Sequence, residues 1–285
     1  MNKYPVQLQN GTAVITGAAN GIGLEIAKHA HQLNMNLVLA DINFDQLLGV
    51  KEDLLLTESK TLLLKTDVSQ EAEIEHLCIK AYEKFGSVEL LCNNAGVSLN
   101  RLSWKHSHQD WEWLMNVNLF SVAHGIRYFV PRMLEQGTPA YIVNTASAAG
   151  LLSTPGMAAY NASKHAVVTL SETLFQELHS INAKIHVSVL CPAWVPTQIH
   201  LAQRNRPERF GAHQDPSDPM SLQYEDRMSN AVQAGKMSAS EIADEVFQAI
   251  EKQQFYIIPH RKINSLIEQR HHEITHLQNP KVSVS

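Results

Sequence analysis

The sequence predicts one doubly wound α/β domain, with a mostly parallel sheet of seven strands and helices on both faces. Apolar runs rich in Val, Ile and Leu alternate with helical patterns along almost the whole chain of 285 residues. This alternation is typical of parallel strands that are joined by helices. The runs lack a polar face, which indicates strands that are buried on both sides of the sheet. A glycine-rich turn between the first strand and the first helix is a third indication.

The first half of the chain contains four expected strands, each a short apolar run bounded by polar residues or glycine. They are Thr12–Thr16, Leu37–Ala40, Thr61–Leu64 and Val88–Cys92. The intervals between them have apolar residues three or four positions apart, the spacing of an amphipathic helix. The expected helices are Gly21–Asn34, Phe44–Thr57, Glu71–Phe85 and, after the fourth strand, Trp111–Leu134.

The second half continues the same alternation with three further apolar runs and two further helical patterns. The expected strands are Tyr141–Thr145, Lys184–Leu190 and Phe255–Ile258. The expected helices are Met157–Ile181 and Ala239–Lys252. Every expected helix before residue 197 lies between two strands, as the connections of a parallel sheet require.

Two segments depart from this regularity. Residues 197–236 form a long irregular connection after a late strand, and such connections are usually functional or disordered. We expect a substrate lid there, with a mobile surface insertion as the alternative. Residues 261–280 have apolar side chains close to helical spacing and predict a C-terminal helical tail that packs on its own subunit or on a neighbour. We treat the whole chain, 1–285, as a single domain.

Composition and charge exclude several classes of function. With 44% hydrophobic and 18% charged residues, the chain has an ordinary globular composition. Its net charge of −5 and the lack of a basic run argue against nucleic-acid binding. No run approaches about 18 apolar residues, and the first ten residues lack the apolar core of a signal peptide. We therefore expect no membrane span and a cytoplasmic location.

The three cysteines and fifteen histidines bear on redox and metal chemistry. The cysteines are odd in number and two lie in apolar strands, which favours buried thiols in a reducing compartment. The pair His106 and His108 and the group His271, His272 and His276 stand without a cluster of Cys or carboxylate residues. We therefore expect no metal site.

The turn that joins the first strand to the first helix reads Gly17-x-x-x-Gly21-x-Gly23. Glycines there let a phosphate approach the backbone, and the N-terminus of the helix offers it free N–H groups. The spacing differs from the common Gly-x-Gly-x-x-Gly fingerprint, and the Lys-Ser/Thr ending of a P-loop is missing. At the first strand–helix junction of an α/β chain, the turn predicts a dinucleotide-binding domain of the Rossmann type.

Asp41 ends the second strand, roughly 20 residues after the turn, where an acidic residue can bind the ribose hydroxyls of the cofactor. A carboxylate at this position would repel the 2′-phosphate of NADP. The neighbours Asn20 and Ile42 supply no cation that could receive that phosphate. We therefore expect NAD in preference to NADP, with a role for Asp41 as a helix N-cap as the alternative.

Tyr160 and Lys164 lie four residues apart, so they share one face of the expected helix. A free tyrosine has a pKa near about 10, and a neighbouring cation lowers it by stabilising the phenolate. Such a pair can pass a proton to or from an alcohol oxygen. The spacing by itself is common on helix surfaces, so the pair needs the support of other motifs.

That support comes from a set of motifs that resembles, in the same order, the classical short-chain dehydrogenase/reductase family over roughly residues 8–260. Besides the residues above, the matching motifs are Asp67-Val68, Asn93-Asn94-Ala95-Gly96, Asn118, Ser147 and the segment Pro192–Thr197. The resemblance implies that the catalytic residues are Asn118, Ser147, Tyr160 and Lys164. It implies a cofactor site made of Gly17, Asn20, Gly21, Ile22, Gly23, Asp41, Asp67, Val68, Asn94, Ala95, Gly96, Tyr160, Lys164, Pro192, Val195 and Thr197. The expected substrate residues are Ser147, Leu151, Met157, Tyr160 and Trp194.

One motif departs from the family pattern. The family has Pro-Gly where this chain has Pro192-Ala193. Alanine adds a methyl group and disfavours positive φ, so we expect at most a small change in this loop.

The resemblance implies an NAD(P)-dependent oxidoreductase that acts on an alcohol or a ketone, with Tyr160 as the general acid/base. Lys164 would bind the nicotinamide ribose and lower the pKa of Tyr160. Ser147 would orient the substrate oxygen, and Asn118 would hold a water molecule of a proton relay. The family also implies a homodimer or homotetramer, formed through the helices expected at about 111–134 and 157–181.

Alternatives remain for the substrate and for the activity. Apolar residues near the expected site favour a hydrophobic secondary alcohol or ketone, whereas Arg204, Arg206 and Arg209 would suit an acidic substrate or a solvated lid surface. A dinucleotide-binding sensor or scaffold without catalysis is the second class of function, because a fold does not establish an activity. The chain lacks the glycine spacing and the larger C-terminal domain of the related epimerases and dehydratases.

Overall fold

The computed structural model describes residues 8–212 and 218–281, so residues 1–7 and the stretch 213–217 of the expected lid lie outside the described residues. Seven strands form one sheet in the order β3-β2-β1-β4-β5-β6-β7, and every neighbouring pair is parallel. The strands are β1 (Thr12–Thr16), β2 (Asn36–Asp41), β3 (Thr61–Lys65), β4 (Leu90–Asn93), β5 (Ala140–Thr145), β6 (Ile185–Leu190) and β7 (Tyr256–Ile257). The predicted doubly wound sheet is confirmed.

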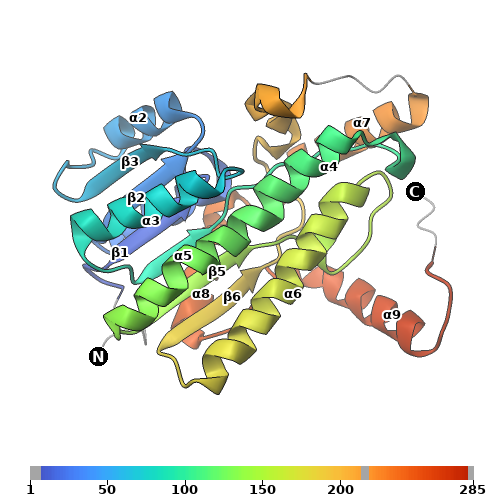
Figure 1. The fold of residues 1–285 in the computed structure, drawn as a ribbon. Coiled ribbons are helices and arrows are strands. Elements are labelled where there is room, and N and C mark those ends of the chain that lie inside the picture. The colour runs from blue at the N-terminus through green and yellow to red at the C-terminus, as the bar shows by residue number, and fades with distance from the viewer. Residues whose placement is uncertain (1–7, 213–217, 282–285) are drawn as a thin grey trace.

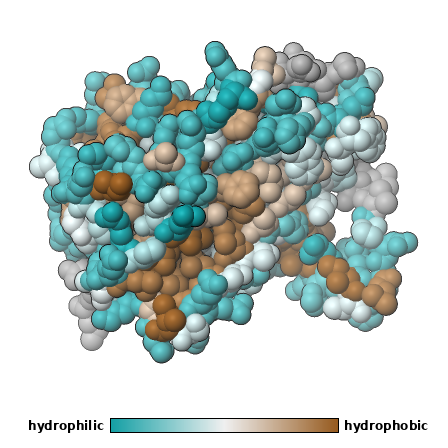
Figure 2. Space-filling view, in the orientation of Figure 1, coloured by the Kyte–Doolittle hydropathy of each residue, from teal (hydrophilic) through white to brown (hydrophobic). Residues whose placement is uncertain are grey.

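Helices cover both faces of the sheet (Figure 1). On one face lie α1 (Gly21–Gln32), α2 (Phe44–Asp53) and α8 (Ala239–Lys252), and on the other lie α3 (Glu71–Phe85), α5 (Ser121–Gln136) and α6 (Ala158–Ser180). Figure 2 shows apolar surface gathered over α5 and α6. Among the described residues, no helix is both long and apolar enough to cross a lipid bilayer.

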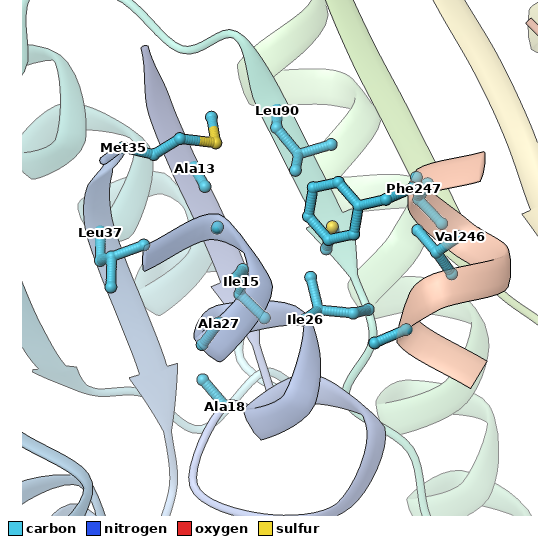
Figure 3. Close-up of a cluster of buried hydrophobic side chains, with 14 of the residues drawn as sticks. Ala13, Ile15, Ala18, Ile26, Ala27, Met35, Leu37, Leu90, Val246 and Phe247 are labelled. Atoms are coloured by element: carbon cyan, nitrogen blue, oxygen red, sulfur yellow. The ribbon is translucent and has the colours of Figure 1, made fainter. Parts of the chain in front are cut away.

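The central strand β1 shows why the sheet needs two helical layers. All five of its residues are buried. Ala13 and Ile15 pack toward α1 and α8, while Val14 between them packs toward the helices of the other face. Alternate side chains of a strand point to opposite faces, so an apolar strand must be covered twice. Figure 3 shows Ile15 and Ile26 beneath Phe247 of α8 in the first of these two cores.

Local signals explain where several helices begin and end. α8 begins after Ser238, whose hydroxyl accepts a hydrogen bond from Glu241 N while the Glu241 carboxylate accepts one from Ser238 N. This reciprocal pair satisfies two backbone donors at the start of the helix. α3 ends at Gly86, which has a φ of 78° and therefore stops the helix in a left-handed conformation.

The long helix predicted at 111–134 has a different internal structure. α4 (His108–Met115) passes into a π-helical segment, Asn116–Phe120, before α5 begins. A π-helical turn inserts an extra residue into a helix and often marks a functional site. Here it contains Asn118, whose side chain is completely buried.

The segment predicted as an irregular lid contains regular structure that we did not predict. Two 3-10 turns, Ile199–Asn205 and Glu208–Phe210, precede helix α7 (Pro219–Gln233). The Asp218 carboxylate caps α7 by accepting a hydrogen bond from Ser221 N (2.8 Å), and Pro219 follows at the first helical position. Both are signals of a helix start, so the sequence contained the information for α7.

Helix α9 (Asn264–Thr275) lies within the range of the predicted helical tail. It extends away from the sheet at the lower right of Figure 1. Three large apolar side chains of this region are exposed, namely Leu266, Ile274 and Leu277. The far end of the tail therefore has an apolar surface that its own chain does not cover.

Candidate active site

A cavity of about 390 Å³ lies at the carboxyl ends of the strands. The strand order reverses between β1 and β4, and open α/β sheets bind ligands at such a switch point. The residues that follow β1, β2 and β4 line one half of the cavity, and those that follow β5 and β6 line the other. The sheet itself therefore brings together motifs that are far apart in the sequence.

The glycine turn forms one wall of the cavity. Gly17 (φ 66°) and Gly21 (φ 57°) adopt left-handed conformations that other residues rarely take. Gly23 has no space for a side chain, because a Cβ atom there would lie 2.2 Å from the carbonyl oxygen of Gly17. Asn20, Gly21 and Ile22 at the N-terminus of α1 line the cavity. Among the described residues, the side chain of the N-cap Asn20 makes no capping hydrogen bond, so the first N–H groups of the helix remain available to a ligand. This is a cradle for an anionic group.

Asparagine side chains tie this turn to the neighbouring strand. Asn94 Nδ2 donates to Thr16 O (3.1 Å) and Gly17 O (3.3 Å), and the backbone N–H groups of Asn94 and Ala95 donate to Thr16 Oγ1. Beneath them, Asn93 Nδ2 donates to Asn144 Oδ1 at 2.9 Å. The Asn-Asn motif thus fixes the distance between β1 and β4, on either side of the switch point.

Two aspartates mark the far end of the cavity, beyond the glycine turn. Asp41 accepts hydrogen bonds from Ala19 N and Asn43 N, each 3.0 Å long. Burial raises the pKa of Asp41, and these backbone hydrogen bonds oppose that effect. Asp67 accepts a hydrogen bond from Arg209 Nη2 at 2.5 Å. Both aspartates line the cavity.

Tyr160 lies in the first turn of α6, at the cavity, and is only 6% exposed. Burial raises the pKa of its phenol, and a hydrogen bond between Ser147 and Tyr160 opposes the rise. We expected Lys164 to lower this pKa. In the structure burial is the largest cause and raises the pKa, because the phenolate would stand in a region that water hardly reaches. The opposing contribution comes from the Ser147 hydrogen bond and not from Lys164.

Lys164 is 2% exposed, and its Nζ lies 5.7 Å from the centroid of the Tyr160 ring. The ammonium donates a hydrogen bond to Thr145 O (2.9 Å). Burial of the charged group lowers the pKa of Lys164 from 10.5 to about 8. The two side chains of the Tyr-x-x-x-Lys motif therefore share one buried site, as their helical spacing predicts.

Asn118 lies behind this pair. A Cβ atom on Gly96 would lie 3.3 Å from Lys164 Nζ and 3.4 Å from Asn118 Oδ1, so Gly96 lies in close contact with both side chains. Asn118 Nδ2 donates to Val97 O (3.0 Å) and Ser163 Oγ (3.1 Å), and Val97 N donates to Asn118 Oδ1 (2.8 Å). The side chain thus clamps the chain after β4 to α6. Its role in holding a water molecule stays a prediction.

Most residues predicted for the site line the cavity, but three do not. Gly23 packs beneath the glycine turn, and Asn118 lies behind Gly96. Leu151, which we predicted to bind substrate, instead packs into an apolar cluster below α6, and its neighbour Leu152 lines the cavity. Leu151 follows the 3-10 turn Ala148–Gly150, and the structure does not place its side chain at the cavity.

The half of the cavity beyond Tyr160 is apolar. Met157 and Trp194 line it, as we expected, and Val97 lines it as well. Further apolar lining residues were not predicted, among them Met228 and Val232 of α7, Ile263 before α9, and Leu266 within α9. The first two stand four apart, so an apolar helical face was visible in the sequence, although its position in space was not.

Two of the three arginines of the predicted lid, Arg206 and Arg209, form ion pairs with aspartates. The Arg206 guanidinium is buried, donates to the Asp110 carboxylate (2.6 Å) and stacks over the Trp113 ring. Arg209 pairs with Asp67 as described. These ion pairs attach the segment 199–210 to the body of the domain.

At Ala193, where the family has glycine, the backbone needs no glycine, because φ is not positive there. Ala193 N donates a hydrogen bond to His260 Nδ1 (3.1 Å).

All three cysteines are buried, free thiols. In the part of the chain that the structure describes, no group of three or more His, Cys, Asp or Glu side chains could hold a metal ion.

Comparison with known proteins agrees with this geometry. The profile of the family described as short chain dehydrogenase matches residues 11–208. A CLA biosynthesis dehydrogenase/reductase of Lactiplantibacillus plantarum is 38% identical over 261 residues, 90% of each chain. A 3beta-hydroxysteroid dehydrogenase of Eggerthella lenta is 36% identical over 71% of this chain and 77% of its own. The crystal structure of a short-chain dehydrogenase/reductase from Burkholderia phymatum in complex with NAD has 42% identity and a TM-score of 0.95, covering 98% of this chain and 99% of that one.

Proposed function

The chain belongs to the short-chain dehydrogenase family of oxidoreductases, and we propose that it transfers a hydride between NAD and a hydrophobic secondary alcohol or its ketone. One observation carries the proposal. The glycine cradle with Asp41 and the group Ser147, Tyr160 and Lys164 line one and the same cavity. A dinucleotide that spans the cavity would reach from the first group to the second.

The residues present fit a nicotinamide dinucleotide. The left-handed Gly17 and Gly21 keep side chains away from the place where a pyrophosphate would meet the N-terminus of α1. Asp41 would bind the adenosine ribose, and the segment Pro192–Thr197 would adjoin the nicotinamide. The related structure that contains NAD supports this class of cofactor, and Asp41 favours NAD over NADP.

The protein groups supply the proton and the orientation. NAD accepts or supplies the hydride. The raised pKa keeps Tyr160 protonated at neutral pH in the chain alone, which is the form that donates a proton to a ketone oxygen. Ser147, which hydrogen-bonds the same phenol, would hold the ketone oxygen in the orientation that allows it to accept the proton of Tyr160. The Lys164 ammonium would stabilise the phenolate that remains.

An uncharged, bulky substrate suits the apolar part of the cavity, on the side away from Asp41 and Asp67. Met157, Val97, Met228 and Val232 surround it with apolar side chains. Arg206 and Arg209 are already paired with aspartates, so they offer no free charge to an acidic substrate. The relatives include a hydroxysteroid dehydrogenase and a CLA biosynthesis enzyme, which supports a large apolar substrate. In this proposal residues 197–236 form its lid.

A substrate panel tests the proposed function. Purified protein would be offered NAD or NADP with secondary alcohols of increasing apolar size, and NADH or NADPH with the matching ketones, followed by absorbance of the reduced cofactor. We expect turnover with NAD(H), rising in kcat/KM with the apolar size of the substrate. NADH binding without turnover on any alcohol or ketone would contradict the proposal and favour the sensor or scaffold.

Gly23→Ala is expected to destabilise the protein by about 1–3 kcal/mol, because the new methyl group would overlap the Gly17 carbonyl oxygen. The turn must shift to relieve the overlap, so we expect NADH affinity to fall at least about tenfold. Urea unfolding and calorimetric titration would measure the two effects.

Gly49→Ala is the matched control. Gly49 lies within α2, its φ is not positive, and an added Cβ would meet nothing within 4 Å. Alanine there should raise helix stability by about 0.5–1 kcal/mol and leave NADH affinity unchanged. Equal NADH affinities in the two variants would show that the tight packing at Gly23 does not shape the cofactor site.

We also propose a homodimer or homotetramer in the cytoplasm. The apolar surface over α5 and α6 supports association through these helices (Figure 2), and both carry exposed large apolar side chains, Leu134 and Phe175. Light scattering would give the mass. A monomer at micromolar concentration would contradict the proposal.

A further inference from the structure

The sequence around Asp41 supplies no cation, yet the fold brings one from a distant segment. Asp41 is 7% exposed, and its neighbours Asn20 and Ile42 are uncharged. Arg204, in the 3-10 turn Ile199–Asn205, lines the same cavity as Asp41. Because Arg204 is distant from Asp41 in the sequence, local patterns did not predict that the two residues line the same cavity.

Arg204 differs from the other two arginines of its segment. Arg206 and Arg209 each form an ion pair with an aspartate. Arg204 donates a hydrogen bond to the neutral side-chain oxygen of Gln198, and among the described residues it forms no ion pair. Its charge nevertheless reaches Asp41, where it lowers the pKa of the carboxyl group against the effect of burial. Arg204 is therefore available to an anion at this end of the cavity.

A second, shallower depression adjoins the cavity at the same place. Arg204, Ile42 and Asn43 line it, together with Lys65. Lys65 is the partner of Asp41 in the β2–β3 register, so it is the second cation near the ribose end. Asp67, which also lines the depression, is already paired with an arginine.

We propose that Arg204 is a specificity-determining residue of the cofactor site. Its guanidinium could bind the 2′-phosphate of NADP, and the Asp41 carboxylate prevents this binding. The inference rests on the proposed dinucleotide site. Asp41 repels the 2′-phosphate and attracts the guanidinium to itself. The preference for NAD thus comes from the carboxylate alone and not from the lack of a cation.

The chemistry of the guanidinium makes the consequence specific. Arginine binds phosphate through two parallel N–H donors, which a lysine ammonium cannot match. Without the carboxylate, Arg204 would be free to turn to a 2′-phosphate. An Asp41→Ser variant should therefore accept NADPH through Arg204, with the serine hydroxyl as an additional donor.

Direct binding of NADH and NADPH, measured by calorimetry without substrate, tests the proposal. The proteins are the wild type, Asp41→Ser, Arg204→Gln, the double variant Asp41→Ser/Arg204→Gln, and the control Asp41→Ser/Lys65→Gln. We expect Asp41→Ser to bind NADPH roughly 10- to 100-fold more tightly than the wild type does. Arg204→Gln should remove most of that gain, whereas Lys65→Gln should leave it within about threefold.

Two outcomes would overturn the role of Arg204. In the first, the double variant with Arg204→Gln binds NADPH as tightly as Asp41→Ser alone. In the second, Lys65→Gln and not Arg204→Gln removes the gain. A wild type that binds neither dinucleotide would instead overturn the proposed function, and this inference with it.

The single variant Arg204→Gln tests the proposal by itself if Asp41→Ser does not fold. With Asp41 in place, loss of the nearby positive charge should weaken NADPH at least about threefold and leave NADH unchanged within about twofold. An equal change in both affinities would contradict a role for Arg204 in selectivity.

Discussion

The Tyr160→Phe variant is expected to lose turnover by about 100- to 10,000-fold, the range that a general acid/base contributes. The substitution removes only the hydroxyl group. The ring remains packed in its apolar cluster with Met157 and Ala159. We therefore expect NADH affinity to stay within about threefold of wild type, because most of the proposed cofactor contacts would come from other residues. Steady-state kinetics and calorimetry would measure the two quantities.

Tyr141→Phe is the control for this experiment. Tyr141 is also a buried tyrosine, and its hydroxyl shares a hydrogen bond of 2.8 Å with Ser188 Oγ, away from the cavity. Its loss should lower the free energy of unfolding by about 1 kcal/mol and leave turnover unchanged. If Tyr160→Phe kept wild-type turnover, the assignment of the acid/base would be wrong. If both variants lost turnover equally, the effect would be structural.

Lys164→Met is expected to lose turnover by at least about 100-fold and, at neutral pH, to be more stable than the wild type in the absence of cofactor. The reason is the buried ammonium. Its pKa in the folded chain, about 8, lies below its ordinary value of 10.5. Keeping the charged form buried at pH 7 therefore costs about 3 kcal/mol. Methionine avoids this cost, although Thr145 O loses its donor, which offsets about 1 kcal/mol.

The pH dependence gives the sign of the effect. Between about 8 and 10.5 the unfolded chain binds more protons at Lys164 than the folded chain does. The stability of the wild type should therefore rise with pH through this window as the buried ammonium loses its proton. The advantage of Lys164→Met should be largest below pH 8 and shrink toward pH 10. Urea unfolding at pH 7 and at pH 9.5 would measure the difference.

Lys184→Met provides the comparison with an exposed lysine. Lys184 Nζ donates to Gly137 O at the surface, far from the cavity. Its substitution should change the free energy of unfolding by less than about 0.5 kcal/mol at either pH and leave turnover intact. A Lys164→Met protein that is less stable than the wild type at pH 7 would show that the buried ammonium stabilises this fold.

The variants Tyr160→Phe and Lys164→Met concern two properties of the site that have different physical origins, the proximity of the two side chains and their altered pKa values. Tyr160 and Lys164 meet because residues four apart on a helix share a face, which is a local property of the sequence. Their altered pKa values come from burial, which depends on the packing of α6 against the sheet. If catalysis needs the buried phenol of Tyr160 and the buried ammonium of Lys164, the protein loses stability in order to keep these groups, which is a trade-off between activity and stability.

The sequence by itself determined the sheet of seven strands, the glycine turn and the order of the motifs. Each rests on a local pattern: apolar runs such as β1 for strands, glycines that permit positive φ at the turn, and the four-residue spacing on α6. The same local information also contained α7, whose start signals at Asp218 and Pro219 we missed. The carboxyl ends of parallel strands meet at one edge, so the approximate place of the site followed as well.

Only the tertiary structure decided which side chains share the cavity. It oriented Leu152 into the site and Leu151 away from it, and it placed Ile263 and Leu266 of the tail in the wall. It also brought Arg204 to Asp41. These arrangements depend on the packing of segments that are distant in the sequence, and no periodicity or spacing encodes that. Local patterns therefore carried the resemblance to the family, and long-range packing determined the charge and shape that a ligand meets.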